Sequence, residues 1–342
     1  MKIIDLRSDT VTKPTPAMLD AMMSAEVDDD VFESDPTVNK LQAFAAELFG
    51  KEAALFCPSG TMTNQIAIAL QSGPLTEVIT EESSHVYNSE VGGISFNSRA
   101  SVKLIKGDRG RMTAAQIAGA INPIDVHKAR TVLVCLENTA NRGGGACYDW
   151  SELEKIRNLC QQNNLKLHLD GARLCNAAIA TNTPLGNYGP LFDTISVCLS
   201  KGLGAPVGSL LISDSKTIFE ARRMRKVLGG GMRQAGYLAA AGLYALQNNI
   251  ERMNNDHQLA KQMATLLKPL SYIDNVIEPE TNILIFNLTE KIAPRAFIDH
   301  LLAHHIKAVS FGEQAIRFVT HLDVGVEELN RLEAALKKFD VR

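Results

Sequence analysis

Hydrophobic residues follow two alternating patterns along most of the chain. Short apolar runs are followed by stretches in which apolar residues recur every three or four positions. The first pattern is typical of buried strands and the second of amphipathic helices, so their alternation predicts a mainly parallel sheet flanked by helices. We expect strands at 53–57, 77–80, 131–137, 166–170, 194–199 and 207–212, and helices at 35–48, 63–70, 113–120, 150–163 and 232–248.

The pattern changes near Asn248. A polar helix at 250–267 is followed by a strand at 282–288, a helix at 294–305, two closely spaced strands at 308–311 and 316–320, and a last helix at 326–339. This order suits a small α/β layer with antiparallel pairing. We therefore expect a large domain over residues 1–248 and a small C-terminal α/β domain over residues 249–342.

Composition limits the class of protein. The 342 residues are 45% hydrophobic and 21% charged, as in a globular protein. A net charge of -3 gives no general attraction to nucleic acid or to an anionic membrane. The six cysteines form no CxxC pair, and the N-terminal apolar stretch is too short for a secretory signal. We expect a cytoplasmic protein that binds neither nucleic acid nor membranes.

Residues 56–64, FCPSGTMTN, predict a phosphate-binding turn. A strand ends there and a helix begins, so unpaired backbone N–H groups and the helix dipole face one point, and the hydroxyl groups of Ser59 and Thr61 add donors. An ordinary helix N-cap explains the same residues equally well when the motif is taken alone.

Two further strands end on reactive side chains. Asp170 ends the strand at 166–170, and Lys201 follows the strand at 194–199. Ligands of α/β sheets bind beyond the carboxyl ends of the strands, and burial there would lower the pKa of Lys201 and make its amine nucleophilic. A capping carboxylate and a solvated lysine are the alternatives. We expect His168, which lies deeper on the same strand face as Asp170, to be a buried structural histidine.

Taken together, the three sites match what pyridoxal phosphate requires. That cofactor needs an anion site, a carboxylate for its ring nitrogen and a lysine for its Schiff base. A dinucleotide site is not expected, because the glycines of residues 202–208 have the wrong spacing and a strand follows them. A metal site is not expected either, since His300 and His304 have no third ligand nearby in the sequence.

Motifs along the whole chain resemble those of threonine aldolases, which are fold type I (aspartate-aminotransferase-like) pyridoxal-phosphate enzymes. They are DLRSDTVT at 5–12, PSGT at 58–61, SH at 84–85, LENT at 136–139, DGAR at 170–173, SKG at 200–202, GGGMRQ at 229–234 and RFVTH at 317–321. The resemblance implies a seven-stranded sheet in the large domain, an N-terminal segment that contributes to the active site, and a homodimer or homotetramer with shared active sites. It also implies cleavage of L-threonine or L-allo-threonine to glycine and acetaldehyde.

The resemblance assigns cofactor contacts to individual residues. Lys201 would carry the cofactor, Asp170 would pair with its ring nitrogen, and His85 would stack on its ring. Arg233, with Lys226 near it, would reach the phosphate across a subunit boundary. The full set of cofactor contacts implied by the resemblance is Lys201, Gly60, Thr61, His85, Asp170, Arg173, Lys226 and Arg233.

The resemblance also assigns substrate contacts. Ser8, Arg173 and Arg317 would bind the amino-acid carboxylate, which Arg can hold through two parallel hydrogen bonds. His85 and His127 would lie near the substrate hydroxyl group, and either His85 or a bound water would take its proton. With Lys201 and Asp170, these two histidines form the expected catalytic set.

One departure from the pattern and several alternatives remain open. Ala140 follows the LENT motif at a position where these enzymes commonly have His, which leaves the contribution of that loop to the pocket undecided. Another fold type I lyase, such as an amino-acid β-eliminase or a cysteine desulfurase, is an alternative. A non-catalytic binding protein on the same scaffold is a second alternative.

Overall fold

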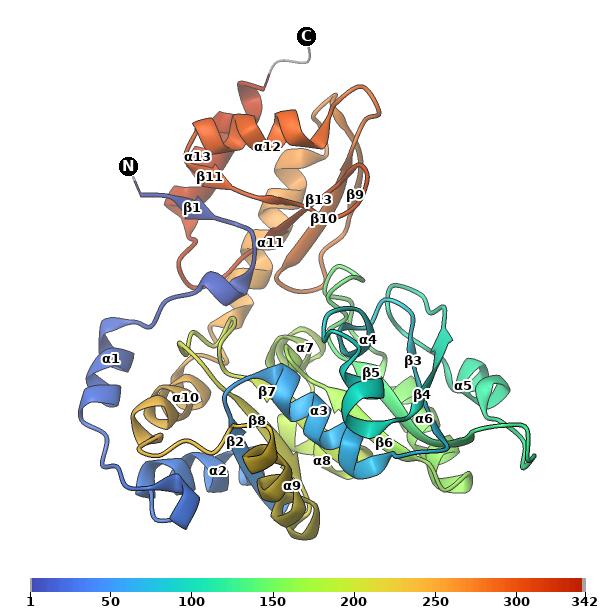
Figure 1. Ribbon diagram of the computed structural model, residues 1–342. Coiled ribbons are helices and arrows are strands. Elements are labelled where there is room, and N and C mark those ends of the chain that lie inside the picture. Colours follow the sequence, from blue (N-terminus) through green and yellow to red (C-terminus); the bar gives the residue numbers. More distant parts are fainter. Residues whose placement is uncertain (1, 340–342) are drawn as a thin grey trace.

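The computed structural model describes residues 2–339. Figure 1 shows a large body built around one sheet, with a smaller body above it that contains the C-terminal elements and the first strand of the chain. The helix α11 (Met253–Leu267) runs between the two bodies (Figure 1). None of the helices found between residues 2 and 339 is both long enough and apolar enough to cross a membrane.

The large sheet has seven strands in the order β2-β8-β7-β6-β5-β3-β4. The strand β8 pairs antiparallel with both of its neighbours, and the remaining pairs are parallel. The expected mainly parallel, seven-stranded sheet is therefore confirmed. The strands are β2 (Ala53–Cys57), β3 (Thr76–Glu81), β4 (Ser101–Ile105), β5 (Arg130–Glu137), β6 (Lys166–Asp170), β7 (Thr194–Cys198) and β8 (Ser209–Ser213).

Helices cover both faces of this sheet because its buried strands are apolar on both sides. In β2, Phe56 packs into one hydrophobic core with α2, whereas Leu55 packs into a second core with α3 and α9. Together, α1, α2 and α10 form a stack on the first face. The helices of the large body are α1 (Pro16–Met23), α2 (Pro36–Leu48), α3 (Gly60–Gln71), α4 (His85–Asn88), α5 (Ala114–Ala120), α6 (Trp150–Gln162), α7 (Leu174–Thr181), α8 (Tyr188–Leu191), α9 (Ser215–Val227) and α10 (Gly236–Asn248).

The small body is an antiparallel sheet in the order β12-β13-β10-β9, packed against helices through an aromatic core. Phe286, Phe297 and Phe318 are fully buried there and meet edge to face. Its elements after α11 are β9 (Ile273–Ile277), β10 (Ile283–Leu288), α12 (Pro294–Ala303), β11 (Ile306–Lys307), β12 (Val309–Ser310), β13 (Ala315–Val319) and α13 (Val326–Lys337).

The first strand joins the two ends of the chain. β1 (Ile4–Asp5) pairs in parallel with β11, with Ile4 opposite Ile306, and Ile4 packs into the small-body core. The division of the chain at residue 248 remains a proposal. It falls between α10 and α11, but it assigns β1 to the large domain although β1 pairs with the small body.

Several boundaries differ from the expected ones. The helix expected from residue 232 begins at Gly236, because residues 229–233 form a loop in which Gly229 adopts a φ of 80°. The strand expected at 308–311 is shortened to β12, and a separate short strand that was not expected, β11, precedes it. β4 and β9 were not expected at all, since both are largely exposed strands with no fully buried residue.

Candidate active site

Three strands of the large sheet bring their carboxyl ends together. The register places Glu137 of β5 opposite Asp170 of β6, and Asp170 opposite Ser196 of β7. Lys201 lies in the turn that follows β7, and α3 begins on the same side. A cavity of about 150 Å³ opens there. It is lined by Ser59, Gly60, Thr61, Asn64, His85, Asp170, Ala172, Cys198, Ser200 and Lys201.

The N-terminus of α3 forms the anion-binding side of this cavity. Ser59 caps the helix, its Oγ accepting the N–H of Met62 at 3.2 Å. Gly60 opens the helix where no side chain fits, because an added Cβ would lie 2.6 Å from Cys198 Sγ. The first backbone N–H groups of a helix have no partner within it, so Gly60 and Thr61 offer donors and a positive dipole end to an anion.

Asp170 is buried and held by neutral donors. Its Oδ2 accepts the amide N–H of Asn64 at 3.0 Å, and its Oδ1 accepts the backbone N–H of Ala172 at 3.1 Å. His168 is fully buried behind it, as expected, with its Nε2 3.1 Å from Asn64 Oδ1. Burial lowers the pKa of His168 to about 4, so this ring is neutral at physiological pH.

His85 begins α4 beside the cavity. Its backbone N–H donates to Glu137 Oε2 at 2.7 Å, and its ring Nδ1 lies 2.9 Å from Glu90 Oε1. The hydrogen bond to Glu90 raises the pKa of His85, against the opposing effect of burial. Burial together with the neighbouring Asp170 charge raises the pKa of the Glu137 carboxyl.

Arg173 is bound to a partner that the sequence did not indicate. Its Nε and Nη2 donate to the two carboxylate oxygens of Asp9 at 2.8 and 2.7 Å, and both side chains are buried. Burial alone would raise the pKa of Asp9, but the Arg173 charge and hydrogen bonds lower it well below its usual range. Ser8 precedes Asp9, so the N-terminal segment reaches the expected carboxylate site.

Arg317 has neutral partners instead. Its Nη1 donates to Asn141 Oδ1 at 2.8 Å, its Nη2 donates to the backbone oxygen of Arg7 at 2.9 Å, and its guanidinium lies 4.5 Å from the centre of the Phe311 ring. Burial and the charge of Arg173 lower its pKa to about 10, so it remains cationic at neutral pH. Among residues 2–339 it forms no ion pair with a carboxylate.

The loop after β5 contributes to this site through Asn141. Ala140 itself is buried and forms an antiparallel bridge with Ala146. Asn141, the next residue, accepts the hydrogen bond from Arg317 that keeps the guanidinium in place. The loop therefore contacts Arg317 through Asn141, although Ala140 itself does not.

Three expected site residues lie elsewhere in the chain. His127 precedes β5 at its amino end, opposite the cavity, with a side chain that is 84% exposed and paired with Asp125. Lys226 lines a separate hollow of about 490 Å³ beside α9. Arg233 is half-exposed and pairs with Asp29 at 3.0 Å. Within one chain, none of the three lines the Lys201 cavity.

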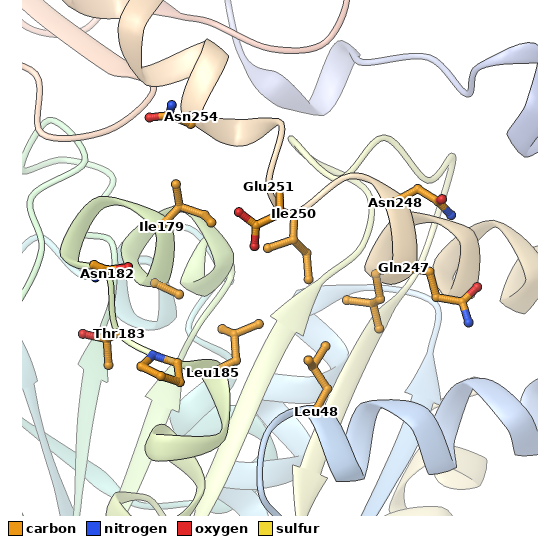
Figure 2. A pocket seen from close by; sticks show the side chains of 13 residues that line it. Leu48, Ile179, Asn182, Thr183, Leu185, Gln247, Asn248, Ile250, Glu251 and Asn254 are labelled. Carbon is orange, nitrogen blue, oxygen red and sulfur yellow. The ribbon is translucent and has the colours of Figure 1, made fainter.

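A larger hollow lies away from the strand ends. It measures about 640 Å³ between the ends of α7 and α10 and the start of α11. Figure 2 shows its apolar residues, among them Leu48 and Ile250, with amide side chains such as Asn182 and Gln247. Glu251 is its single ionisable lining residue. Three of the four residues expected for catalysis, Lys201, His85 and Asp170, line the smaller cavity, and His127 lines neither hollow.

Asp9 and Asn141 were missed because their partners lie 164 and 176 positions away in the sequence. Glu90 lies only five positions from His85, but a lone carboxylate does not show which side chain it will contact. Asn64 gave one weak signal, as the middle of three polar residues, Thr63 to Gln65, that lead into the apolar part of α3 and are all buried. Buried polar side chains require partners, so this polar run could have been taken as a sign of a buried network.

Comparisons with known proteins agree with this geometry. The family model for beta-eliminating lyases matches residues 5–291. The chain is 42% identical over 341 residues to the low specificity L-threonine aldolase of Escherichia coli K12, covering 99% of this chain and 100% of the relative. It is 40% identical over 337 residues to low-specificity L-threonine aldolase 1 of Arabidopsis thaliana, covering 96% and 94%.

Solved structures share the fold. A threonine aldolase of Leishmania major superposes with a TM-score of 0.84 at 23% identity, covering 98% of this chain and 99% of that one. A serine palmitoyltransferase of Sphingomonas wittichii superposes with a TM-score of 0.77 at 14% identity, covering 98% and 86%. The architecture is that of fold type I pyridoxal-phosphate enzymes, and the chain belongs to the beta-eliminating lyase family.

Proposed function

We propose that this protein is a pyridoxal-phosphate-dependent lyase that cleaves L-threonine and L-allo-threonine to glycine and acetaldehyde. The observation that carries the proposal is the joint position of Lys201, Asp170 and the N-terminus of α3 around one cavity. The part-buried cation Arg317 interacts with the charge of Asp9, which in turn interacts with Lys201. The threonine aldolase relatives align with nearly the whole chain, which supports the same reaction.

The residues of the cavity fit the cofactor. Gly60 and Thr61 would hold the phosphate at the start of α3. Gly60 lies so close to Cys198 that a side chain would not fit there. Asp170 would face the ring nitrogen, and Lys201 would hold the cofactor at its carbonyl carbon. When bound, the cofactor supplies the electron sink that makes cleavage of a bond at Cα possible.

The substrate carboxylate would lie against the arginines. Arg173 is already neutralised by Asp9, whereas Arg317 is part-buried with neutral partners. A charge that is partly removed from water is stabilised by an opposite charge, so we assign the main ionic contact to Arg317. Ser8 and a free N–H edge of Arg173 would contribute further hydrogen bonds.

Deprotonation of the substrate hydroxyl releases the aldehyde. His85 faces the cavity and would accept this proton directly or through a water. His127 would take part only in the active site of a neighbouring subunit, because it lies at the opposite end of the sheet in its own chain.

We also propose a homo-oligomer with shared active sites. Phe219 and Val227 are 63% and 79% exposed around the hollow that contains Lys226. Exposed apolar groups gathered in this way are typical of interaction sites, and Lys226 and Arg233 would there approach the phosphate of a partner. A cytoplasmic location suits the six buried cysteines, none of which forms a disulfide within residues 2–339.

The function is tested by supplying purified protein and pyridoxal phosphate with each threonine diastereomer in turn. We expect equal amounts of glycine and acetaldehyde from each, with faster cleavage of the allo form. Formation of pyruvate from serine or sulfide from cysteine, without acetaldehyde from either threonine, would instead identify a β-eliminase or a desulfurase. No turnover at all, despite cofactor binding, would indicate a binding protein.

A further inference from the structure

We propose that Glu90 is a positioning residue that fixes two groups of the cavity at once. It holds His85 with ring Nε2 as the proton acceptor that faces the substrate, and it holds Asn64 against Asp170. This inference rests on the proposed function for the roles of His85 and Asp170, but the contacts that carry it lie entirely within the chain.

Glu90 is a buried carboxylate that accepts three side-chain hydrogen bonds. Its Oε1 lies 2.9 Å from His85 Nδ1 and also accepts the N–H of Asn64 at 2.9 Å. Its Oε2 accepts the N–H of Gln65 at 2.6 Å. The three neighbours belong to α3 and α4, which contact each other. Glu90 therefore ties the helix that begins at the anion site to the helix that carries His85.

The orientation of Asn64 follows from its neighbours. Its Nδ2 lies between two carboxylate oxygens, Glu90 Oε1 and Asp170 Oδ2, which can only accept when ionised. Its Oδ1 therefore faces His168 Nε2, which must donate, and His168 Nδ1 accepts from the Thr194 hydroxyl at 2.8 Å. With the amide in this orientation, every one of these contacts pairs a donor with an acceptor.

The same reasoning assigns the tautomer of His85. Nδ1 must donate to Glu90, because the carboxylate has no hydrogen to offer. When the ring is neutral, Nε2 then holds the lone pair. No protein partner of Nε2 is found among the described residues, and the ring lines the cavity. A histidine acts as a general base when a carboxylate accepts the hydrogen of one ring nitrogen and the other nitrogen keeps a lone pair that can accept a proton.

The charges around His85 set the pH dependence. Glu90 and Asp170 raise the pKa of His85, Lys201 and burial lower it, and Glu137 holds the backbone N–H. A base must be neutral to act, so activity is lost as the pH falls through the pKa of His85. Removal of the Glu90 charge lowers that pKa and should move the acid limb of the kcat/KM profile to lower pH.

Glutamine cannot replace Glu90. Its one carbonyl oxygen cannot accept all three hydrogen bonds that Glu90 accepts from His85, Asn64 and Gln65, and its NH₂ group would face at least one of these donors. The test compares E90Q and E90D with wild type, and E81Q is the matched control. Glu81 has nearly the same exposure, 5% against 4%, but its carboxylate accepts from Ser83 and Gly107 and does not contact His85.

We expect kcat of E90Q to fall by roughly tenfold to a hundredfold, with the acid limb moved to lower pH. E90D should recover part of kcat and return the limb toward its wild-type position, whereas E81Q should lose stability without moving the limb. An unmoved limb in E90Q, or a limb that moves equally in E81Q, would overturn the proposal.

A second measurement does not depend on activity or on the folding of a variant. In ¹⁵N-labelled full-length wild-type holoenzyme, the ring of His85 should titrate with Nδ1 protonated in its neutral form. Protonation at Nε2 instead would contradict the proposal. Because this NMR readout is independent of turnover, a failure of the proposed reaction and a failure of the Glu90 assignment can be told apart.

Discussion

The buried Arg173 and the part-buried Arg317 differ in their partners. Arg173 forms a bidentate pair with Asp9, and Arg317 is held by an amide, a backbone carbonyl and an aromatic ring. Arg173 is paired with the Asp9 carboxylate without substrate, whereas no carboxylate of the described residues forms an ion pair with Arg317. This difference predicts unequal effects of substitution at the two positions.

We predict that Arg317→Lys raises KM roughly tenfold or more, since a lysine cannot form two parallel hydrogen bonds and such charge-assisted bonds are worth about 1.5–3 kcal/mol. Arg142→Lys is the control, because Arg142 contacts the same Phe311 ring at 5.3 Å. Steady-state kinetics with L-allo-threonine measure both variants. Unchanged KM in Arg317→Lys would remove Arg317 from the carboxylate site.

The Asp9–Arg173 pair should be visible in stability. Asp9→Asn leaves a buried guanidinium without its counter-charge, and we predict a loss of about 3–5 kcal/mol in the free energy of unfolding near pH 7. Because Arg173 lowers the pKa of Asp9 in the folded state, the wild type should lose this stabilisation as the pH falls below about 4. Urea titrations should therefore show the two proteins converging at acid pH; a constant difference would contradict the assignment.

At the scale of elements, the start of α3 determines whether the cavity can hold a phosphate. A glycine is required at position 60, because a Cβ added there would lie 2.6 Å from Cys198 Sγ. We predict that Gly60→Ala raises the dissociation constant of pyridoxal phosphate at least tenfold, or about 1.4 kcal/mol, as measured by spectrophotometric titration.

Gly119 in α5 provides the matched control for this glycine. An added Cβ there meets no heavy atom of the described chain within 4 Å. Gly119→Ala should leave cofactor affinity unchanged and raise the free energy of unfolding by roughly 0.5–1 kcal/mol. Equal cofactor affinity in both variants would mean that α3 does not hold the phosphate.

The sequence predicted elements well where burial imposes a strong pattern. β7 and β8 are buried on both faces and are largely apolar, so their positions were expected. β6 and its tip residue Asp170 were expected as well, although polar residues alternate with the two leucines of β6. Edge strands such as β4 lack that pattern. The partners Asp9 and Glu90 lie 164 and 5 positions from the residues they hold; a lone carboxylate gives no sign of which cation or imidazole it will meet after folding.

At the scale of the whole molecule, the placement of Arg233 and Lys226 outside the cavity predicts that one chain is incomplete. If Arg233 serves a neighbouring subunit, K201A and R233A should each be nearly inactive alone. Mixing them under conditions that exchange subunits should restore activity, because a hybrid contains one site with both residues. Sedimentation should also give a mass above the 37.2 kDa of one chain. Absence of complementation between folded, exchanging variants would argue against shared sites.

Lys201 is the residue on which the proposed function depends most, because it is expected to hold the cofactor. The direct measurement is borohydride reduction of the holoprotein followed by peptide mass spectrometry. We predict one pyridoxyl group, attached to Lys201, together with loss of acetaldehyde production from L-threonine and L-allo-threonine. A label on another lysine, or full activity in the protein labelled at Lys201, would contradict it.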